Sequence, residues 1–195
     1  MTDTFFDFIR TTTNENFISS QEEVFNHSSY NPYSEDLDVI EDFLDKEELV
    51  KAVEYNNINV ILSPRAHLYK NYALDKMNKE KEAQAELIFA HKIMEGISLT
   101  GNGTKEMPYM VTRVSDEKDM LRYFQEEFKS QSLVKNENSI LDLIQCQSGK
   151  EIYFDITRPY LRMQELMNSG KLESPIQKMM NENETKKKKW WEFWK

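Results

Sequence analysis

Apolar residues recur at helical spacing through the front half of the chain, from about residue 36 onward. Positions three, four and seven apart share one face of a helix, so this spacing predicts amphipathic helices. The positions that follow it are Leu37, Ile40, Phe43, Leu44, Leu49, Val50 and Val53. Upstream, the cluster FFDFI at residues 5–9 predicts a short helical turn. Residues 25–36 are a connector rich in Asn, Ser and Pro, which favour bends.

A helical hairpin is expected next. Ser63 followed by Pro64 is a typical helix start, because serine caps free N–H groups and proline fits the first helical position. That helix should end near residues 77–78, and a second helix runs from about 79 to 95. Small residues would let the two helices approach closely, and the unit resembles a tetratricopeptide hairpin. These small residues are Ala66, Ala73, Ala83 and Ala90.

Beyond a glycine turn at residues 100–109, the helical spacing gives way to strand patterns. The segment IYFDI, for example, alternates with period two, which predicts a half-buried strand. Four strands are predicted at about 109–114, 130–134, 139–145 and 151–156, with helices at about 116–124 and 160–167. The whole pattern predicts an α+β fold, with a helical half followed by a small, mostly antiparallel sheet and one or two helices.

We therefore divide the chain into five segments. Residues 169–185 are polar and poorly patterned, so they are expected to form a flexible linker. The segments are an N-terminal segment and turn (1–35), a helical region (36–97), a small α+β domain (98–168), the linker (169–185) and a tail (186–195).

The tail, KKKKWWEFWK, holds all three tryptophans of the chain. Tryptophan is normally buried in a core or an interface, so the tail is expected to meet a partner surface. As a short helix it would gather its aromatic rings on one side, but ten residues are too few to be helical alone in water. The residues expected to bind are Lys186, Lys187, Lys188, Lys189, Trp190, Trp191, Phe193 and Trp194.

The charge of the chain is divided unequally. The net charge is -9, and the tail carries five lysines against Glu192, so residues 1–185 total -13. Such an acidic body argues against nucleic acid as a ligand, because phosphates need a basic surface. An opposite charge on the tail is typical of an interaction segment. The tail could also dock on the acidic body of its own chain.

The sequence favours a cytoplasmic protein. The N-terminal residues lack the basic start and apolar run of a secretory signal, and no apolar stretch is long enough to cross a bilayer. Cys146 is the one cysteine, so an internal disulfide is excluded, which fits a reducing compartment. The tail would then be the route to the inner face of the membrane.

Four segments carry a resemblance to a known family. They are YNPY at residues 30–33, GNG at 101–103, QSLV at 131–134 and YFD at 153–155. Over about residues 25–168 the chain resembles an uncharacterised Bacteroidetes family, the domain of unknown function 4919. Asn102 stands where that family more often has Asp. The resemblance implies a fold with a helical front and a final strand before a helix, and it implies no catalytic residues.

Candidate chemistry is sparse. Gly101 and Gly103 lack the GxxxxGK[ST] pattern of a phosphate loop, so we interpret them as a structural turn. Cys146 has no histidine near it in sequence, and the three histidines do not stand at metal-binding spacing. We therefore expect no catalytic residue, no metal and no cofactor.

An acidic run at residues 35–48 is the remaining candidate surface. On a helix Asp38, Asp42 and Asp45 would share one face, because they are three and four residues apart. This face is either solvated or a docking face for a basic partner.

These observations predict a non-enzymatic interaction or adaptor protein. The tail would dock it to a protein partner or to an anionic membrane surface, where lysine and tryptophan both bind favourably. Two alternatives remain: an immunity-type protein whose acidic body binds a basic partner, and an enzyme of unrecognised type in the α+β half. Such an enzyme would gather several of Tyr153, Asp155, Arg158 and Cys146 in a deep pocket. The sequence leaves the oligomeric state open.

Overall fold

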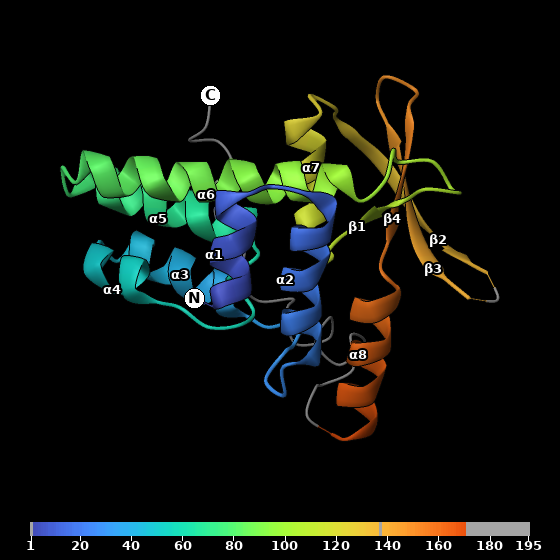
Figure 1. The fold of residues 1–195 in the computed structure, drawn as a ribbon, viewed down its shortest axis with the longest axis horizontal. Coiled ribbons are helices and arrows are strands. Elements are labelled where there is room, and N and C mark those ends of the chain that lie inside the picture. Colours follow the sequence, from blue (N-terminus) through green and yellow to red (C-terminus); the bar gives the residue numbers. More distant parts are fainter. Residues whose placement is uncertain (1, 137, 171–195) are drawn as a thin grey trace.

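The computed structural model describes residues 2–136 and 138–170. Six helices come first: α1 (Asp3–Arg10), α2 (Asn14–Asn26), α3 (Asp36–Asp45), α4 (Leu49–Glu54), α5 (Pro64–Lys76) and α6 (Glu80–Leu99). The back half contains β1 (Tyr109–Met110), α7 (Asp116–Tyr123), β2 (Phe128–Lys135), β3 (Ile140–Cys146), β4 (Glu151–Asp155) and α8 (Thr157–Asn168). The predicted α+β class, with a helical front and a small sheet, is confirmed (Figure 1).

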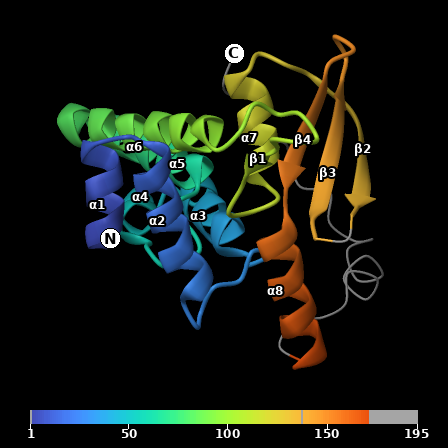
Figure 2. The ribbon, with the colours of Figure 1, turned by 45° about the vertical axis from the view of Figure 1, so that its right-hand side comes forward.

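The expected helical hairpin is formed by α5 and α6, which lie side by side in both views (Figures 1 and 2). Pro64 is the first residue of α5, as expected of a residue without a backbone N–H. The alanines that permit close approach, Ala66, Ala73, Ala83 and Ala90, are all buried. The likeness to a tetratricopeptide unit stays a prediction.

The sequence pattern missed α2. Its buried face includes Ser20 and Gln21 beside Phe17 and Val24, so two polar residues interrupt the apolar spacing. Ser20 Oγ donates to the carbonyl oxygen of Thr4 at 2.9 Å, which compensates its burial. A helix that buries hydrogen-bonded polar side chains carries a weak hydrophobic signal.

The sheet has the strand order β1-β4-β3-β2. Both β2–β3 and β3–β4 pair antiparallel, and β1 pairs parallel to β4. The expected strand at 109–114 is limited to Tyr109–Met110, because the chain then turns at Arg113 towards α7. Strand β2 is an edge strand, and helix α7 lies between the sheet and the helical half (Figure 2).

One buried cluster joins the two halves of the chain. It includes Phe5 and Phe17 from the first helices, Ile93 from α6, Met120 from α7 and Phe154 from β4. A second, smaller cluster lies among α3, α4 and α5. The main core therefore takes residues from both sides of residue 97. In the described part of the chain, no helix is long and apolar enough to span a bilayer.

Candidate polar cleft between the helices and the sheet

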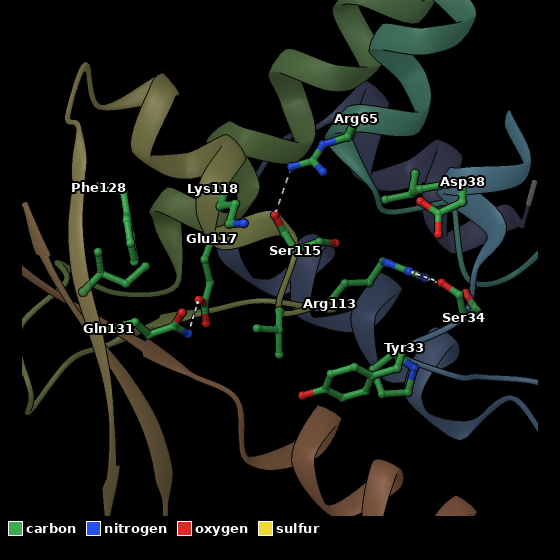
Figure 3. Close-up of a pocket in the computed structure, with 14 residues that line it drawn as sticks. Tyr33, Ser34, Asp38, Arg65, Arg113, Ser115, Glu117, Lys118, Phe128 and Gln131 are labelled. Atoms are coloured by element: carbon green, nitrogen blue, oxygen red, sulfur yellow. Dashed lines mark hydrogen bonds between the residues drawn. The ribbon is translucent and has the colours of Figure 1, made fainter. Parts of the chain in front are cut away.

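A cleft of about 390 Å³ lies between the helical half and the sheet. One wall is the loop Pro32–Ser34 with the start of α3, and the opposite wall is β2. Figure 3 shows Arg65 entering from α5 and Arg113 running from the centre towards Ser34. The centre is the segment Arg113–Lys118, where the chain enters α7. We call this site the polar cleft.

The turn into α7 is held by its own polar groups. The backbone N–H of Arg113 donates to Asp116 Oδ2 at 3.0 Å, and the N–H of Asp116 donates to the Arg113 carbonyl at 3.0 Å. Ser115 precedes the helix, yet its side chain makes no capping hydrogen bond. Acids in the first turn of a helix are stabilised by its macrodipole. These local interactions explain the turn but leave several polar atoms of the segment without partners.

Unpartnered polar atoms concentrate in this segment. Among the described residues, seven buried side-chain nitrogen and oxygen atoms lack a hydrogen-bond partner, and five of them belong to residues 113–119. Buried polar groups are nearly always hydrogen-bonded, so such a concentration marks a functional candidate. The five atoms are Arg113 Nε, Ser115 Oγ, Asp116 Oδ1, Glu117 Oε1 and Asp119 Oδ2.

Glu117 and Asp142 form a buried carboxyl pair beside the cleft. Gln131 Nε2 donates to Asp142 Oδ2 at 2.7 Å and to Glu117 Oε2 at 3.3 Å. Glu117 is 2% exposed, and burial together with the nearby Asp142 raises the pKa of Glu117 to about 10. Burial also raises the pKa of Asp142. At neutral pH the Glu117 carboxyl is therefore protonated and can donate a hydrogen bond.

The two arginines of the cleft have different partners. Arg65 Nη2 pairs with Asp119 Oδ1 at 2.9 Å. Arg113 instead donates to neutral acceptors: Ser34 Oγ at 2.8 Å, the Ser34 carbonyl at 2.7 Å and the Asn59 carbonyl at 3.2 Å. Burial raises the pKa of Asp119 although Arg65 opposes the shift. Burial likewise raises the pKa of Asp116 to about 7, with Arg113 opposing.

The YNPY segment, residues 30–33, forms part of the wall opposite β2. Tyr30 is buried, and its hydroxyl donates to the Thr112 carbonyl at 2.7 Å. The carbonyl of Tyr30 accepts from Arg162 Nε of α8 at 3.0 Å. Asn31 Oδ1 accepts from the N–H of Tyr33 at 3.0 Å, which turns the chain so that Tyr33 reaches the cleft. Tyr33 is therefore positioned by a turn that is hydrogen-bonded to the back half of the chain, at Thr112 and Arg162.

The acidic face of α3 is only partly at the cleft. Asp38 is exposed and lines the cleft, whereas Asp42 pairs with Lys46 at 2.6 Å on the exposed side of the helix. Asp45 is exposed at the last position of α3. Whether this face docks a basic partner stays a prediction.

The glycine segment lies in a tight turn away from the cleft. Gly103 has a backbone φ of +77°, a conformation that residues with a Cβ rarely adopt. Gly101 lies against the backbone of Pro108, where a Cβ would clash with the carbonyl oxygen. The N–H groups of Asn102 and Gly103 both donate to the Met107 carbonyl, at 2.9 and 3.0 Å. The tail residues, from Lys186 to Trp194, lie outside the described residues.

The residues suggested for an enzyme in the back half are dispersed. Asp155 and Arg158 line a small cavity of about 210 Å³, and neither Tyr153 nor Cys146 lines it. Cys146 is buried in β3. His67 is also buried, with Nδ1 at 2.6 Å from Glu86 Oε2 and Nε2 at 3.1 Å from the Ile61 carbonyl. Within the described chain, no group of three or more His, Cys, Asp or Glu residues could hold a metal ion.

Sequence reasoning missed the residues that define the cleft: Arg65, Arg113, Glu117, Gln131 and Asp142. One signal was present in β3. Its inward positions are Ile140, Asp142, Ile144 and Cys146, so a carboxyl replaces an apolar side chain on the buried face of the strand. A buried carboxyl needs a partner, and the partner is one that only the folded chain supplies.

Comparison with known families identifies the class of protein. A model of the domain of unknown function 4919 matches residues 20–165, so the chain belongs to that family, as the sequence motifs indicated. The matched region runs from α2 to α8 and includes the whole polar cleft. Comparisons with curated proteins and with solved structures gave no significant match.

Proposed function

We propose that this protein is a non-enzymatic interaction protein that recognises its partner in the polar cleft and is docked by its basic-aromatic tail. The observation that carries the proposal is the concentration of unpartnered buried polar atoms in residues 113–119, three of which belong to residues that line the cleft: Arg113, Ser115 and Glu117. Binding sites are usually preformed clefts in which a few converging polar groups fix the orientation of the ligand. Aromatic side chains on opposite walls add contact area: Tyr33 is 38% exposed and Phe128 is 45% exposed.

The tail is included in the proposal because of its composition. Four consecutive lysines followed by WWEFW suit either an anionic membrane surface or an apolar groove of a protein. On an anionic bilayer each lysine adds about 1 kcal/mol of attraction, and tryptophan prefers the interface. Binding at the inner face of the membrane would be reversible, in a protein otherwise cytoplasmic.

Two variants separate the cleft from the tail. One replaces both exposed rings, as Tyr33→Ala with Phe128→Ala, and the other deletes residues 186–195. We expect the ring variant to lose partner capture, in pull-downs from soluble and membrane fractions, while keeping its fold. Phe6→Ala is a matched control, because Phe6 is also 45% exposed but lies on α1 outside the cleft.

The tail deletion is tested by flotation with vesicles of phosphatidylglycerol and phosphatidylethanolamine, and by the same pull-downs. We expect it to abolish flotation or partner recovery and to leave the fold intact. If capture is unchanged in the ring variant, and neither capture nor flotation changes in the deletion, the proposed function is wrong.

A second candidate function is an acid–base enzyme, which the Glu117–Asp142 pair favours. In such a pair the protonated carboxyl can donate a proton to a substrate, and the ionised carboxylate can accept one. Turnover of a panel of chromogenic glycosides, esters and phosphates, lost in Glu117→Gln, would support this candidate. No turnover of any substrate in the panel would favour the interaction protein.

A further inference from the structure

Carboxyl groups outnumber cationic groups at the polar cleft. We count the residues that line it and the acids hydrogen-bonded to those residues. This set has six carboxyls and three cations: Asp36, Asp38, Asp116, Glu117, Asp119 and Asp142 against Arg65, Arg113 and Lys118. Arg122, exposed on α7, adds a positive charge near Asp119 but does not line the cleft. The carboxyls remain in excess, and several of them are buried.

Two of the carboxyls in this set without an ion pair are the buried Glu117 and Asp142. Arg65 is paired with Asp119, and Arg113 is directed to Ser34 and Asn59. Among the described residues, no ion pair reaches Glu117 or Asp142. Glu117 is 98% buried, lines the cleft and has an unpartnered Oε1. A positively charged hydrogen-bond donor would stabilise the ionised form of this pair, whereas an anion would meet carboxyl groups that cannot neutralise it.

The walls of the cleft also suit a cation. The rings of Tyr33 and Phe128 are both partly exposed and belong to opposite walls (Figure 3). The face of an aromatic ring attracts an ammonium or guanidinium group. The volume of about 390 Å³ falls in the range of sites that enclose a small ligand or a single side chain.

We infer that the polar cleft receives one cationic side chain, of the arginine or lysine type, from a basic peptide segment. This inference rests on the proposed function and names the chemistry of the partner. The guanidinium or ammonium would donate to the Glu117–Asp142 pair and lie against Tyr33 or Phe128. Lys118 is exposed at the rim and can turn to solvent as the ligand enters.

Binding of a cation is linked to release of a proton. Free Glu117 is protonated at neutral pH, because its pKa is raised to about 10. An arriving cation favours the ionised carboxyl, so the Glu117 proton passes to solvent while the ligand keeps its charge. The affinity should therefore increase with pH between about 6 and 9, by up to tenfold per unit.

The probe is Nα-acetyl-arginine methylamide, whose guanidinium does not titrate in this range, with the citrulline analogue as a neutral control. Calorimetry in two buffers of different ionisation enthalpy gives the number of protons released. We expect the arginine probe to bind with release of about one proton, and the citrulline probe to bind at least tenfold more weakly. No binding of the arginine probe at 10 mM, or equal binding of both probes, would overturn the inference.

The Glu117→Gln variant tests whether the Glu117 carboxyl binds the cation. This variant keeps the shape of the side chain but has no proton to release, so binding should weaken tenfold or more and lose its pH dependence. Asp42→Asn is the control, because it also replaces a carboxyl by an amide and lies outside the cleft. Unchanged binding in the Glu117→Gln variant, with its fold verified by circular dichroism, would contradict the assignment.

The basic segment could belong to the tail or to another protein. To distinguish these sources, the affinity of a peptide of residues 182–195 for the chain lacking 186–195 is compared with that of a poly-arginine peptide of equal length. Tighter binding of the tail peptide supports self-docking, and tighter binding of poly-arginine supports a separate partner. If neither probe nor peptide binds but capture still depends on Tyr33 and Phe128, the proposed function stands and the ligand chemistry assigned here is wrong.

Discussion

Glu117 and Asp142 are joined through one amide: Gln131 Nε2 donates to Asp142 at 2.7 Å and to Glu117 at 3.3 Å. The first carboxyl comes from α7, the second from β3 and the amide from β2. Two carboxyls so close and so buried cannot both ionise at low cost, so a proton is retained between them. This pair gives the polar cleft a dependence on pH that surface acids lack.

Stability should decrease as pH rises above 5. An acid whose pKa is raised in the folded state binds a proton that the unfolded chain releases, so its contribution is complete below the unfolded pKa and is lost as pH rises. For Glu117 the window is from the ordinary 4.5 to about 10, and for Asp116 from 3.8 to about 7. Within its window, each such proton lowers the free energy of unfolding by about 1.4 kcal/mol per pH unit. Urea unfolding between pH 5 and 9 measures it.

Glu117→Gln is the matched variant for that series. It should unfold with a flatter pH dependence and should be more stable than the natural chain at pH 8, since glutamine does not ionise. Equal slopes for the two chains would show that Glu117 is ionised in the folded state.

Tyr30→Phe should destabilise the fold. The variant removes the donor to the Thr112 carbonyl, which then lies buried without that hydrogen bond. An unsatisfied buried carbonyl costs about 1–3 kcal/mol. Tyr123→Phe is the control, because Tyr123 is 39% exposed and the change should stay within about 0.5 kcal/mol. If chemical denaturation gives the same change in unfolding free energy for both variants, the Tyr30 hydroxyl does not stabilise the fold as proposed.

Gly96→Ala should destabilise the contact between α6 and the first two helices. A Cβ at this position would lie 2.5 Å from Phe17 Cδ2 and 2.9 Å from Phe8 Cε2, so buried rings must move. Overpacking costs about 1–3 kcal/mol, which exceeds the gain of about 1 kcal/mol from alanine in a helix. Gln84→Ala, at an exposed position of α6, should be nearly neutral. A thermal shift scan that finds Gly96→Ala neutral or stabilising would contradict the packing argument.

Deletion of residues 186–195 tests whether the tail lies on the acidic segment. If it docks there, its removal should increase amide hydrogen exchange in residues 35–48, because a covering segment protects the backbone beneath it. Exchange measured by mass spectrometry on both chains decides this. Unchanged exchange in residues 35–48 would exclude self-docking on that segment.

Much of the fold could be predicted because it depends on local patterns. The spacing of apolar residues gave α3 to α6, Ser63 and Pro64 marked the start of α5, and alternation located β3 and β4. The pattern failed at α2, where buried Ser20 and Gln21 replace apolar residues. It also extended β1 too far, because the burial of Val111 and Thr112 comes from tertiary packing instead of strand pairing.

The sequence by itself determined the class of fold, the family and the separation of charge between an acidic body and a basic-aromatic tail. These properties follow from periodicity, motifs and composition, which need no long-range contacts. Only the tertiary structure decided where the polar cleft lies. It brings Arg65, Glu117 and Asp142 together from α5, α7 and β3, and it buries two of the three. Burial is what changes the protonation of a carboxyl, and burial is a property of the folded chain as a whole.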